Sequence, residues 1–400
     1  MTIVLLEALT FGLGRLADAA AEAGRKLVLF TGNRDIYRYE LGMLGPDRVE
    51  VVDIDTTDLA ACEAALRAIP DLAGIINSTD TWALPGAELT ARFGLPGPDA
   101  AAVRVLRDKG AVRELLYEHG LTRGRPAPVM VAEELGFPLV IKDSSGTSSR
   151  GVWLVRDAPE LERVRLAAKD TPLKGHLIAE PYFAGPLYSA ETLTWQGRTR
   201  LLGILSRQLS PEPVRREEAA AFPVAFPHTE HAQLAEWIGQ VLKAAGHEQG
   251  FAHTEFVLTA DGPEVVEINI RIGGAMLGEA LCRSLGTNVY SAMISLALGE
   301  EPALLTQEIG GGPGIGFVLA YPAVEGVLKG WSGLDRLPGL PGAPEWYPTA
   351  SPGDEIRHLA DQRSCTGIVL AEGPTAELAL HRALAAAGGI TPEIEPFPGS

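Results

Sequence analysis

The sequence predicts an α/β protein with a doubly wound parallel sheet at its N-terminus and a smaller α+β lid. Three observations support this fold class. Apolar strands alternate with helical periodicity over residues 1–100, and a strand–loop–strand unit spans residues 137–155. The third observation is a pair of short strands over residues 251–271 that meet at an Asp-Gly turn.

The N-terminal elements follow the rhythm of βαβ units. The predicted strands are Thr2–Leu6, Lys26–Phe30, Val49–Ile54 and Leu72–Asn77, and a helix over Leu13–Ala23 separates the first two and ends at Gly24. Parallel neighbours need such crossover helices, so these strands are expected to form one parallel sheet.

Two loops of this region follow strands and carry possible binding chemistry. Gly12 and Gly14 match a dinucleotide-binding fingerprint in part, since Ala17 occupies the third glycine position. Asn77–Asp80 follows the fourth strand, at the edge where open α/β sheets bind ligands. The alternative is that Ser78 or Asp80 caps the next helix, and the sequence leaves both interpretations open.

The remaining chain reads as a second α+β region and a mixed C-terminal part. We expect a helix over Ala100–His119 broken at Gly110, strands over Phe137–Lys142, Val152–Val155, Leu177–Glu180 and Tyr188–Thr194, and helices over Ala232–Ala245 and Ala376–Ala387. Arg215–Glu218 is interpreted as a solvated loop, and Pro338–Pro352 as an ordered surface loop or short linker.

Composition excludes several classes of function. The 400 residues carry a formal net charge of −17, so the basic surface that binds nucleic acid or anionic membranes is missing. No apolar run approaches the roughly 18 residues of a membrane span. The N-terminus reads as a buried strand rather than a signal peptide, and three scattered cysteines fit a reducing cytoplasm.

The hairpin carries the clearest chemical signal. Glu255 lies on its first strand, and Glu267, Asn269 and Arg271 alternate along one face of the second. Two carboxylates and an amide oxygen suit Mg²⁺, and Arg271 offers a fixed fork of donors to a carboxylate or phosphate. A solvated strand face with a Glu267–Arg271 ion pair is the alternative.

Two further segments suit a nucleotide. The small residues of Ser144–Gly151 would let backbone N–H groups approach phosphates, with Lys142 adding a positive charge. A flexible hairpin with a surface lysine is the alternative. Glu180–Phe183 ends an apolar strand and could bind adenine through its main chain.

The order of these parts resembles the ATP-grasp superfamily. Asp108-Lys109-Gly110, Lys142 with its Ser/Gly loop, the Glu180–Phe183 hinge, Glu255 and Glu267-x-Asn269-x-Arg271 with Gly273-Gly274 follow one another in that order. The resemblance covers about residues 1–300, and the tail after residue 310 is similar to the biotin-carboxylase-type C-terminal lobe. Phe251–Glu255 resembles the carboxylate–amine or L-amino-acid ligase branch.

The resemblance implies a role for each matching residue. Lys109 and Lys142 would contact the ATP phosphates under the 144–151 loop, which includes Ser144, Ser145, Gly146, Ser148 and Ser149. Adenine would be held by Glu180, Pro181, Tyr182 and Phe183, and one or two Mg²⁺, with Mn²⁺ as a substitute, would be bound by Glu255, Glu267 and Asn269. The substrate would be faced by Arg271, Gly273, Gly274 and His253. Arg271 and Lys142 would be the catalytic residues. A packed core position is the alternative for His253.

One position departs from the family pattern. Leu187 stands where many members carry an acid that binds the ribose hydroxyls. Either another group binds the ribose or the affinity for nucleotide is lower. Glu191 is a candidate polar contact, but strand parity alone does not place it in the site.

The resemblance implies an ATP-dependent ligase that joins a carboxylate to an amine through an acyl phosphate, with small-molecule, amino-acid substrates. The expected domains are residues 1–105, a linker helix and lid over 106–185, and a C-terminal lobe over 186–400, and a homodimer is compatible with the family. The rivals are a biotin-carboxylase-like carboxylase subunit and a nucleotide-binding protein without catalysis. No Met-Lys-Met biotinylation motif occurs in the chain.

Overall fold

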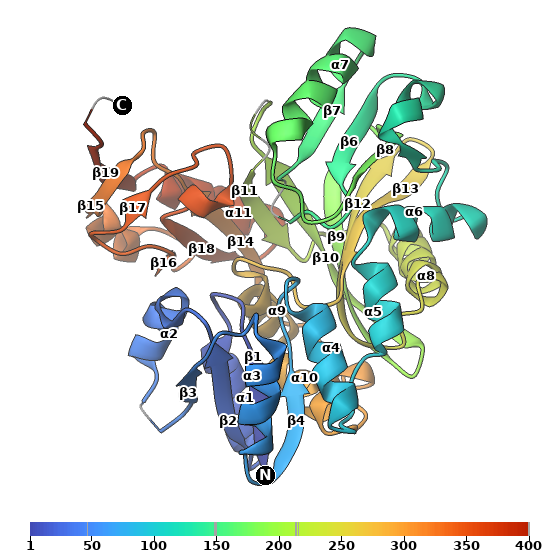
Figure 1. The fold of residues 1–400 in the computed structure, drawn as a ribbon. Helices are drawn as coiled ribbons and strands as arrows, with labels where there is room; N and C mark the ends of the chain where they lie inside the picture. Colours follow the sequence, from blue (N-terminus) through green and yellow to red (C-terminus); the bar gives the residue numbers. More distant parts are fainter. Residues whose placement is uncertain (46, 148–149, 213, 215, 399–400) are drawn as a thin grey trace.

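The N-terminal sheet of the computed structural model is parallel, as the alternation of strands and helices predicted (Figure 1). The structure describes residues 1–45, 47–147, 150–212, 214 and 216–398. The strands are β1 (Thr2–Leu6), β2 (Lys26–Thr31), β3 (Glu50–Asp53) and β4 (Leu72–Ile76), in the order β3-β2-β1-β4.

Helices cover both faces of this sheet. Neighbouring side chains of a strand point to opposite sides, so each strand packs against helices on both faces. Ile3 and Leu5 pack with α1 (Leu13–Glu22) and α10 (Tyr290–Ala297). Val4 and Leu6 pack with α3 (Leu59–Arg67) and α4 (Ala83–Arg92) on the other face. The doubly wound prediction is therefore confirmed, with α10 arriving from a distant part of the chain.

The Gly12–Gly14 loop is engaged within the protein. Its backbone N–H groups at Gly12, Leu13 and Gly14 donate to the Glu40 carboxylate of α2 (Arg38–Met43), at 3.0 Å from Gly12 and 3.3 Å from Gly14. A Cβ at Gly12, whose φ is 110°, would lie 2.0 Å from the Tyr290 hydroxyl. The glycine is thus required by close packing against α10.

The predicted helix over residues 100–119 is two helices, α5 (Ala100–Leu106) and α6 (Lys109–Glu118). The break lies at Arg107–Asp108, so its prediction at Gly110 was wrong. The Asp108 carboxylate caps α6 by accepting from the Ala111 N–H at 2.9 Å, and Gly110 lies within the first turn. Because α6 begins directly after Asp108, Lys109 lies at the N-terminal end of this helix.

The lid is a four-stranded antiparallel sheet of order β5-β8-β6-β7, with α7 (Ala158–Ala167) packed on it. Its strands are β5 (Ala127–Pro128), β6 (Leu139–Asp143), β7 (Val152–Val155) and β8 (Leu177–Pro181). The loop between β6 and β7 is the predicted Ser/Gly loop, of which Ser148 and Ser149 lie outside the described residues.

An eight-stranded antiparallel sheet joins the hairpin to the C-terminal part. Its order is β13-β12-β9-β10-β11-β14-β18-β16, formed by Gly262–Asn269, Gln249–Thr259, Leu187–Trp195, Arg198–Leu209, Glu217–Phe222, Gly314–Ala320, Gly367–Gly373 and Glu345–Pro348. Helix α8 (His228–Ala244) packs near the hairpin end and α11 (Ala376–Ala387) near the C-terminal end. A small sheet, β17-β15-β19, is built from Glu355–Ile356, Gly326–Ser332 and Thr391–Pro396.

Two loop predictions are corrected by this sheet. Glu217 and Glu218 begin β11, and Glu217 is buried because it pairs with Arg207 of β10, while Arg215 lies outside the described residues. The Pro338–Pro352 segment contains β16, which hydrogen-bonds to β18 as the edge strand. The charged run of residues 215–218 was read as a loop although β11 pairs with the preceding strand β10 and with the distant β14, and β16 pairs with a strand that follows it in the sequence.

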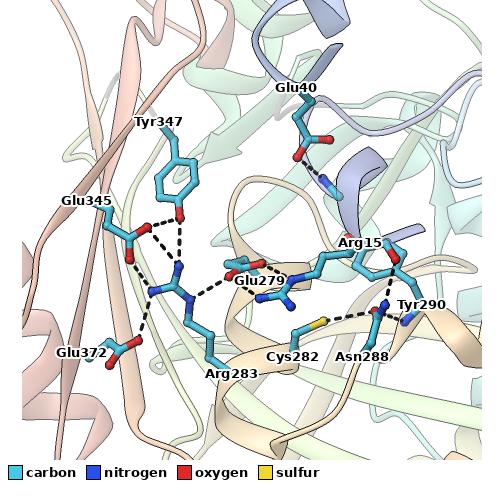
Figure 2. Close-up of polar contacts among 11 residues, drawn as sticks. Arg15, Glu40, Glu279, Cys282, Arg283, Asn288, Tyr290, Glu345, Tyr347 and Glu372 are labelled. Atoms are coloured by element: carbon cyan, nitrogen blue, oxygen red, sulfur yellow. Dashed lines mark hydrogen bonds and ion pairs between the residues drawn. The ribbon is translucent and has the colours of Figure 1, made fainter. Parts of the chain in front are cut away.

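Helix α9 (Leu277–Leu285) lies where the N-terminal sheet, the hairpin and the C-terminal strands meet (Figure 1). Figure 2 shows the polar contacts that fix it. Arg15 of α1 donates to Glu279 at 2.8 and 2.9 Å. Arg283 donates to Glu279 on its own helix at 2.7 Å, to Glu345 of β16 at 2.5 Å and to Glu372 of β18 at 3.0 Å.

Candidate active site

Glu255 and Glu267 are direct neighbours across the hairpin. The register of β12 and β13 pairs Glu255 with Glu267 and His253 with Asn269. Both carboxylates line a cavity of about 850 Å³ bounded by the lid, the eight-stranded sheet and the N-terminal loops. The Asn269 side-chain amide donates to Glu267 at 2.9 Å. The predicted metal ligands are therefore together, with Asn269 supporting Glu267.

Each of these carboxylates contacts a cation. The ammonium of Lys109 lies 2.9 Å from Glu267 and donates to the Gly146 carbonyl at 2.6 Å. Arg207 pairs with Glu255 and lies 3.3 Å from Glu217. Burial alone would raise the pKa of Glu255, but the Arg207 guanidinium holds that pKa well below its usual range.

This donor set fits a hard divalent cation. Two adjacent carboxylates and one amide oxygen are the ligands that Mg²⁺ accepts when phosphates and water complete its shell. Among the described residues no group of three or more His, Cys, Asp and Glu side chains is arranged to hold a metal. Glu255, Glu267 and Asn269 would therefore supply only part of the coordination shell of such a cation.

Lys142 and Glu180 form a buried charge cluster beneath the lid. The Lys142 ammonium lies 2.5 Å from Glu180 and donates to the Val266 carbonyl at 3.1 Å. Arg113 of α6 donates to the same carboxylate at 3.1 Å. Burial lowers the pKa of Lys142, whereas Arg113 and Lys142 together overcome burial and lower the pKa of Glu180. All three side chains line the cavity.

The start of the Ser/Gly loop is held by its own hydrogen bonds. Ser144 is fully buried, and its carbonyl accepts from the Lys109 N–H at 2.9 Å. The Ser145 N–H donates to the Asp143 carboxylate at 3.0 Å. Gly146 lines the cavity, whereas Ser144 and Ser145 do not. Among the residues described in this loop, Gly146 is therefore the best-placed of the predicted phosphate contacts.

The predicted adenine hinge borders the cavity along its whole length. Pro181, Tyr182 and Phe183 line it beside Glu180, and so does Leu187. The Tyr182 N–H donates to the Pro138 carbonyl at 3.2 Å, so the hinge is anchored to the lid. Arg113 lies 5.3 Å from the centre of the Phe183 ring.

Arg271 meets the N-terminal domain. It lies two residues beyond β13, its N–H donates to the Asn269 carbonyl at 2.9 Å, and its guanidinium pairs with Asp80. Burial alone would raise the pKa of Asp80, but Arg271 and Arg107 hold that pKa below its usual value. Gly274 also lines the cavity, whereas Gly273 packs against His253 and Leu277.

Of the two interpretations of the Asn77–Asp80 loop, the structure favours a position at the cavity. Asp80 lines it, while Ser78 accepts from the Leu9 N–H at 3.3 Å. Neither side chain caps α4, which begins after Trp82 without a side-chain cap. The capping interpretation was wrong, because both side chains bind residues distant in sequence.

His253 is buried and also lines the cavity. Its Nδ1 lies 2.7 Å from the Glu191 carboxylate and its Nε2 lies 3.4 Å from Glu255. Burial opposes protonation, yet Glu191 raises the pKa of His253 to about 9. Glu191 is occupied by this contact and by the Ser189 hydroxyl at 2.8 Å, and it does not line the cavity.

Sequence reasoning missed three charged residues of the cavity, and it did not identify Asp80 as the partner of Arg271. Arg113, Arg207, Glu217 and, as a partner of Arg271, Asp80 all line the cavity. Arg113 and Glu217 are ordinary charges in a helix and at a presumed loop. Strand parity along β10 could have placed Arg207 on one face, but nothing local identified its partner.

Comparison with known families matches two parts of the chain. Residues 135–279 match the ATP-grasp domain, and residues 318–395 match the L-amino acid ligase C-terminal domain 2. The first match contains the lid, the hinge and the hairpin, and the second contains the C-terminal strands and α11.

Similar proteins agree with these matches. Protein y4rH of Sinorhizobium fredii is 26% identical over 372 residues, which are 88% of this chain and 76% of y4rH. Carnosine synthase 1 of Gallus gallus is 29% identical over 248 residues, 54% of this chain and only 26% of the synthase. The chain thus spans about a quarter of the length of that synthase.

Solved structures share the fold. The L-amino acid ligase of Bacillus licheniformis has a TM-score of 0.82 at 20% identity, over 98% of both chains. The biotin carboxylase domain dimer of the Hydrogenobacter thermophilus 2-oxoglutarate carboxylase, crystallised with MgADP and bicarbonate, has a TM-score of 0.76 at 18% identity, over 98% of this chain and 90% of that one.

The fold and the family matches define an enzyme of the ATP-grasp ligase class, a class that uses ATP and Mg²⁺. Its C-terminal lobe is of the L-amino acid ligase type. Among the described residues, no helix combines the length and apolar character needed to cross a bilayer.

Proposed function

We propose that this chain is an ATP-dependent carboxylate–amine ligase that acts on an amino acid and releases ADP and phosphate. The observation that carries the proposal is the meeting of Glu255, Glu267 and Arg271 with Lys109 and Lys142 around one cavity. The C-terminal family match favours an amino-acid substrate.

The proposed reaction has two steps. A carboxylate oxygen of the acid attacks the γ-phosphorus of ATP, the bond to the β–γ bridging oxygen breaks, and ADP leaves. The amine nitrogen of the second substrate then attacks the acyl carbon, phosphate leaves, and the nitrogen loses a proton. The product is an amide, and the phosphate carries the oxygen lost by the acid.

The chain's residues would mainly position charge. Glu255, Glu267 and Asn269 would hold one or two Mg²⁺, which offset the charge on the transferring phosphoryl group. Mn²⁺ shares the preference for oxygen ligands and is expected to substitute. Lys109 and Lys142 would contact phosphate oxygens, and Gly146 would border them from the lid.

Arg271 and Gly274 would hold the acid. A guanidinium fork fixes a planar carboxylate in two places, which orients the attacking oxygen. The pairing of Arg271 with Asp80 holds the fork in the cavity. Pro181, Tyr182 and Phe183 would border adenine, and the contact for the ribose at Leu187 is not assigned.

The test is a screen of amino-acid pairs read by phosphate release. The proposal expects release that needs ATP, Mg²⁺ and both amino acids. Release that needs bicarbonate and biotin instead would establish the carboxylase rival. A lack of release across broad acid and amine panels, with nucleotide still bound, would favour a binding protein without catalysis.

A further inference from the structure

The cavity extends beyond the charged site to the junction of three lobes. Besides the lid residues, its lining includes Phe11 from the N-terminal domain, Leu205 from β10, Leu277 from α9, and Leu319 and Ile368 from the C-terminal strands β14 and β18. One cavity therefore connects the Glu255–Arg271 region with side chains from three distant parts of the sequence.

These five residues form a single apolar wall. All belong to one contiguous hydrophobic cluster, and none exposes more than 7% of its surface. Leu319 and Ile368 are direct partners across β14 and β18. We call this set the inner wall.

The inner wall begins close to the proposed reaction centre. The strand register aligns Leu205, Ser189, Glu255 and Glu267 in one row across β10, β9, β12 and β13. Neighbouring strands lie about 4.8 Å apart, so Leu205 is about 10 Å from Glu255 along the sheet. This row of residues connects the proposed metal ligands with the inner wall.

Charged residues of this part of the cavity are at its rim or already paired. The side chains of Arg38 and Arg363 are 46% and 48% exposed, and they bind Asp354 and Asp361 respectively. In the interior, Arg207 lies between two carboxylates, Glu217 at 3.3 Å and Glu255. A buried charge on a substrate side chain would find no free partner among these groups, and would lose hydration.

The wall is held in place by α9. Leu277 begins this helix, and the Arg15–Glu279–Arg283 contacts tie the helix to α1, β16 and β18 (Figure 2). Ion pairs on both sides of α9 resist a change in the shape of the wall. A fixed apolar wall selects by size and polarity.

We propose that the inner wall binds the side chain of a substrate amino acid, and that this side chain is apolar. The proposal rests on the ligase function above. Leu319 is its main determinant of size, because it lies in the wall, opposite Ile368, and comes from the C-terminal lobe.

The first experiment is direct binding of L-leucine, L-phenylalanine, L-aspartate and L-lysine by calorimetry, with ADP and Mg²⁺ present. The expected result is that leucine or phenylalanine binds at least about tenfold more tightly than aspartate or lysine. Equal or tighter binding of the charged amino acids would overturn the apolar wall, whether or not ADP is formed in the ligase assay.

The second experiment compares Leu319→Ala with Leu281→Ala. Leu281 belongs to the same cluster and is also buried, but it does not line the cavity. Leu319→Ala should raise the affinity ratio of phenylalanine to valine by about tenfold, while Leu281→Ala leaves it within twofold. Unfolding curves confirm that both variants fold. A shared change in the ratio, or none, would remove Leu319 from the substrate pocket.

These readouts separate the two proposals. Tight binding of apolar amino acids without ADP release for any partner would leave the inner wall standing and overturn the ligase. If ADP release were fastest with amino acids that carry charged side chains, the ligase proposal would stand and the inner-wall proposal would be overturned.

Discussion

Glu255 and Glu267 each contact a cationic side chain, Arg207 and Lys109. For Glu255, burial alone would raise the pKa of the carboxyl, and the Arg207 guanidinium holds that pKa below its usual range. On the proposed mechanism Lys109 would also face the phosphates. The charges needed for phosphoryl transfer are thus arranged in advance, which lowers the reorganisation needed in the transition state.

Glu267→Gln is expected to abolish turnover with the fold intact. Removing one ligand charge should cost at least about 3 kcal/mol of transition-state stabilisation, roughly a hundredfold in kcat. Steady-state kinetics at saturating Mg²⁺ measures this, and the exposed Glu308→Gln is the control. Activity of the Glu267 variant within threefold of the wild type would remove Glu267 from the metal site.

Arg271→Lys is expected to lower kcat at least about tenfold, because an ammonium cannot reproduce a two-point clamp on a carboxylate. The KM for ATP should change little. Kinetics with ATP and the acid varied separately distinguishes the two roles. If the KM for ATP alone rose, Arg271 would be a nucleotide contact.

Burial of His247, which does not line the cavity, should make the stability of the protein depend on pH. Burial lowers its pKa to about 4, and its Nε2 lies 3.2 Å from the Gly250 carbonyl. Because the unfolded chain binds this proton first, stability should fall between about pH 6.5 and pH 4, by on the order of 3 kcal/mol. Denaturant unfolding of the wild type and His247→Gln measures this, and the variant should lose less stability. Identical pH profiles would show that His247 titrates normally.

At the scale of elements, the lid loop is expected to change on nucleotide binding. Amide hydrogen exchange at Gly146 and Thr147 should slow when a non-hydrolysable ATP analogue and Mg²⁺ are added, because the loop would close over phosphates. Helix α7, on the same lid, serves as the internal control. Unchanged exchange at both residues would mean that this loop does not cover the nucleotide.

Elements whose signals are local could be predicted from the sequence. The hairpin follows from its Asp-Gly turn and alternation, and β1, β7 and α11 have the predicted bounds. The helix break at Gly110 failed because the Asp108 cap and the Lys109–Ser144 backbone contact outweigh the low propensity of one glycine. Strand β16 was missed because its pairing with β18 is a tertiary contact.

The same distinction between local signals and tertiary contacts applies to the residues of the site. Residues within motifs, such as Lys109, Glu255 and Glu267, could be predicted because the family order identifies them. Arg207, the partner of Glu255, could not be predicted, and neither could the pairing of Asp80 with Arg271, because only the folded chain shows which distant charges meet. The roles assigned to the site residues, and the domain boundaries near 105 and 185, stay predictions.

At the scale of the whole molecule, three lobes converge on one cavity. The lid and the hairpin would bind nucleotide and metal, the N-terminal domain supplies Asp80 to Arg271, and the C-terminal lobe completes the inner wall. On the proposed function, each of the three parts would supply a different portion of the site. On the proposed mechanism the acid would lie beside the terminal phosphate rather than the α-phosphate.

The most direct test of the central claim is the identity of the nucleotide product. Carboxylates are activated either by phosphorylation, which releases ADP and phosphate, or by adenylation, which releases AMP and pyrophosphate. With a productive pair of substrates, chromatography should show ADP and phosphate in equal amounts, and hydroxylamine should trap the acid alone as a hydroxamate. AMP and pyrophosphate as the main products would contradict the acyl-phosphate mechanism and the roles assigned to the cavity residues.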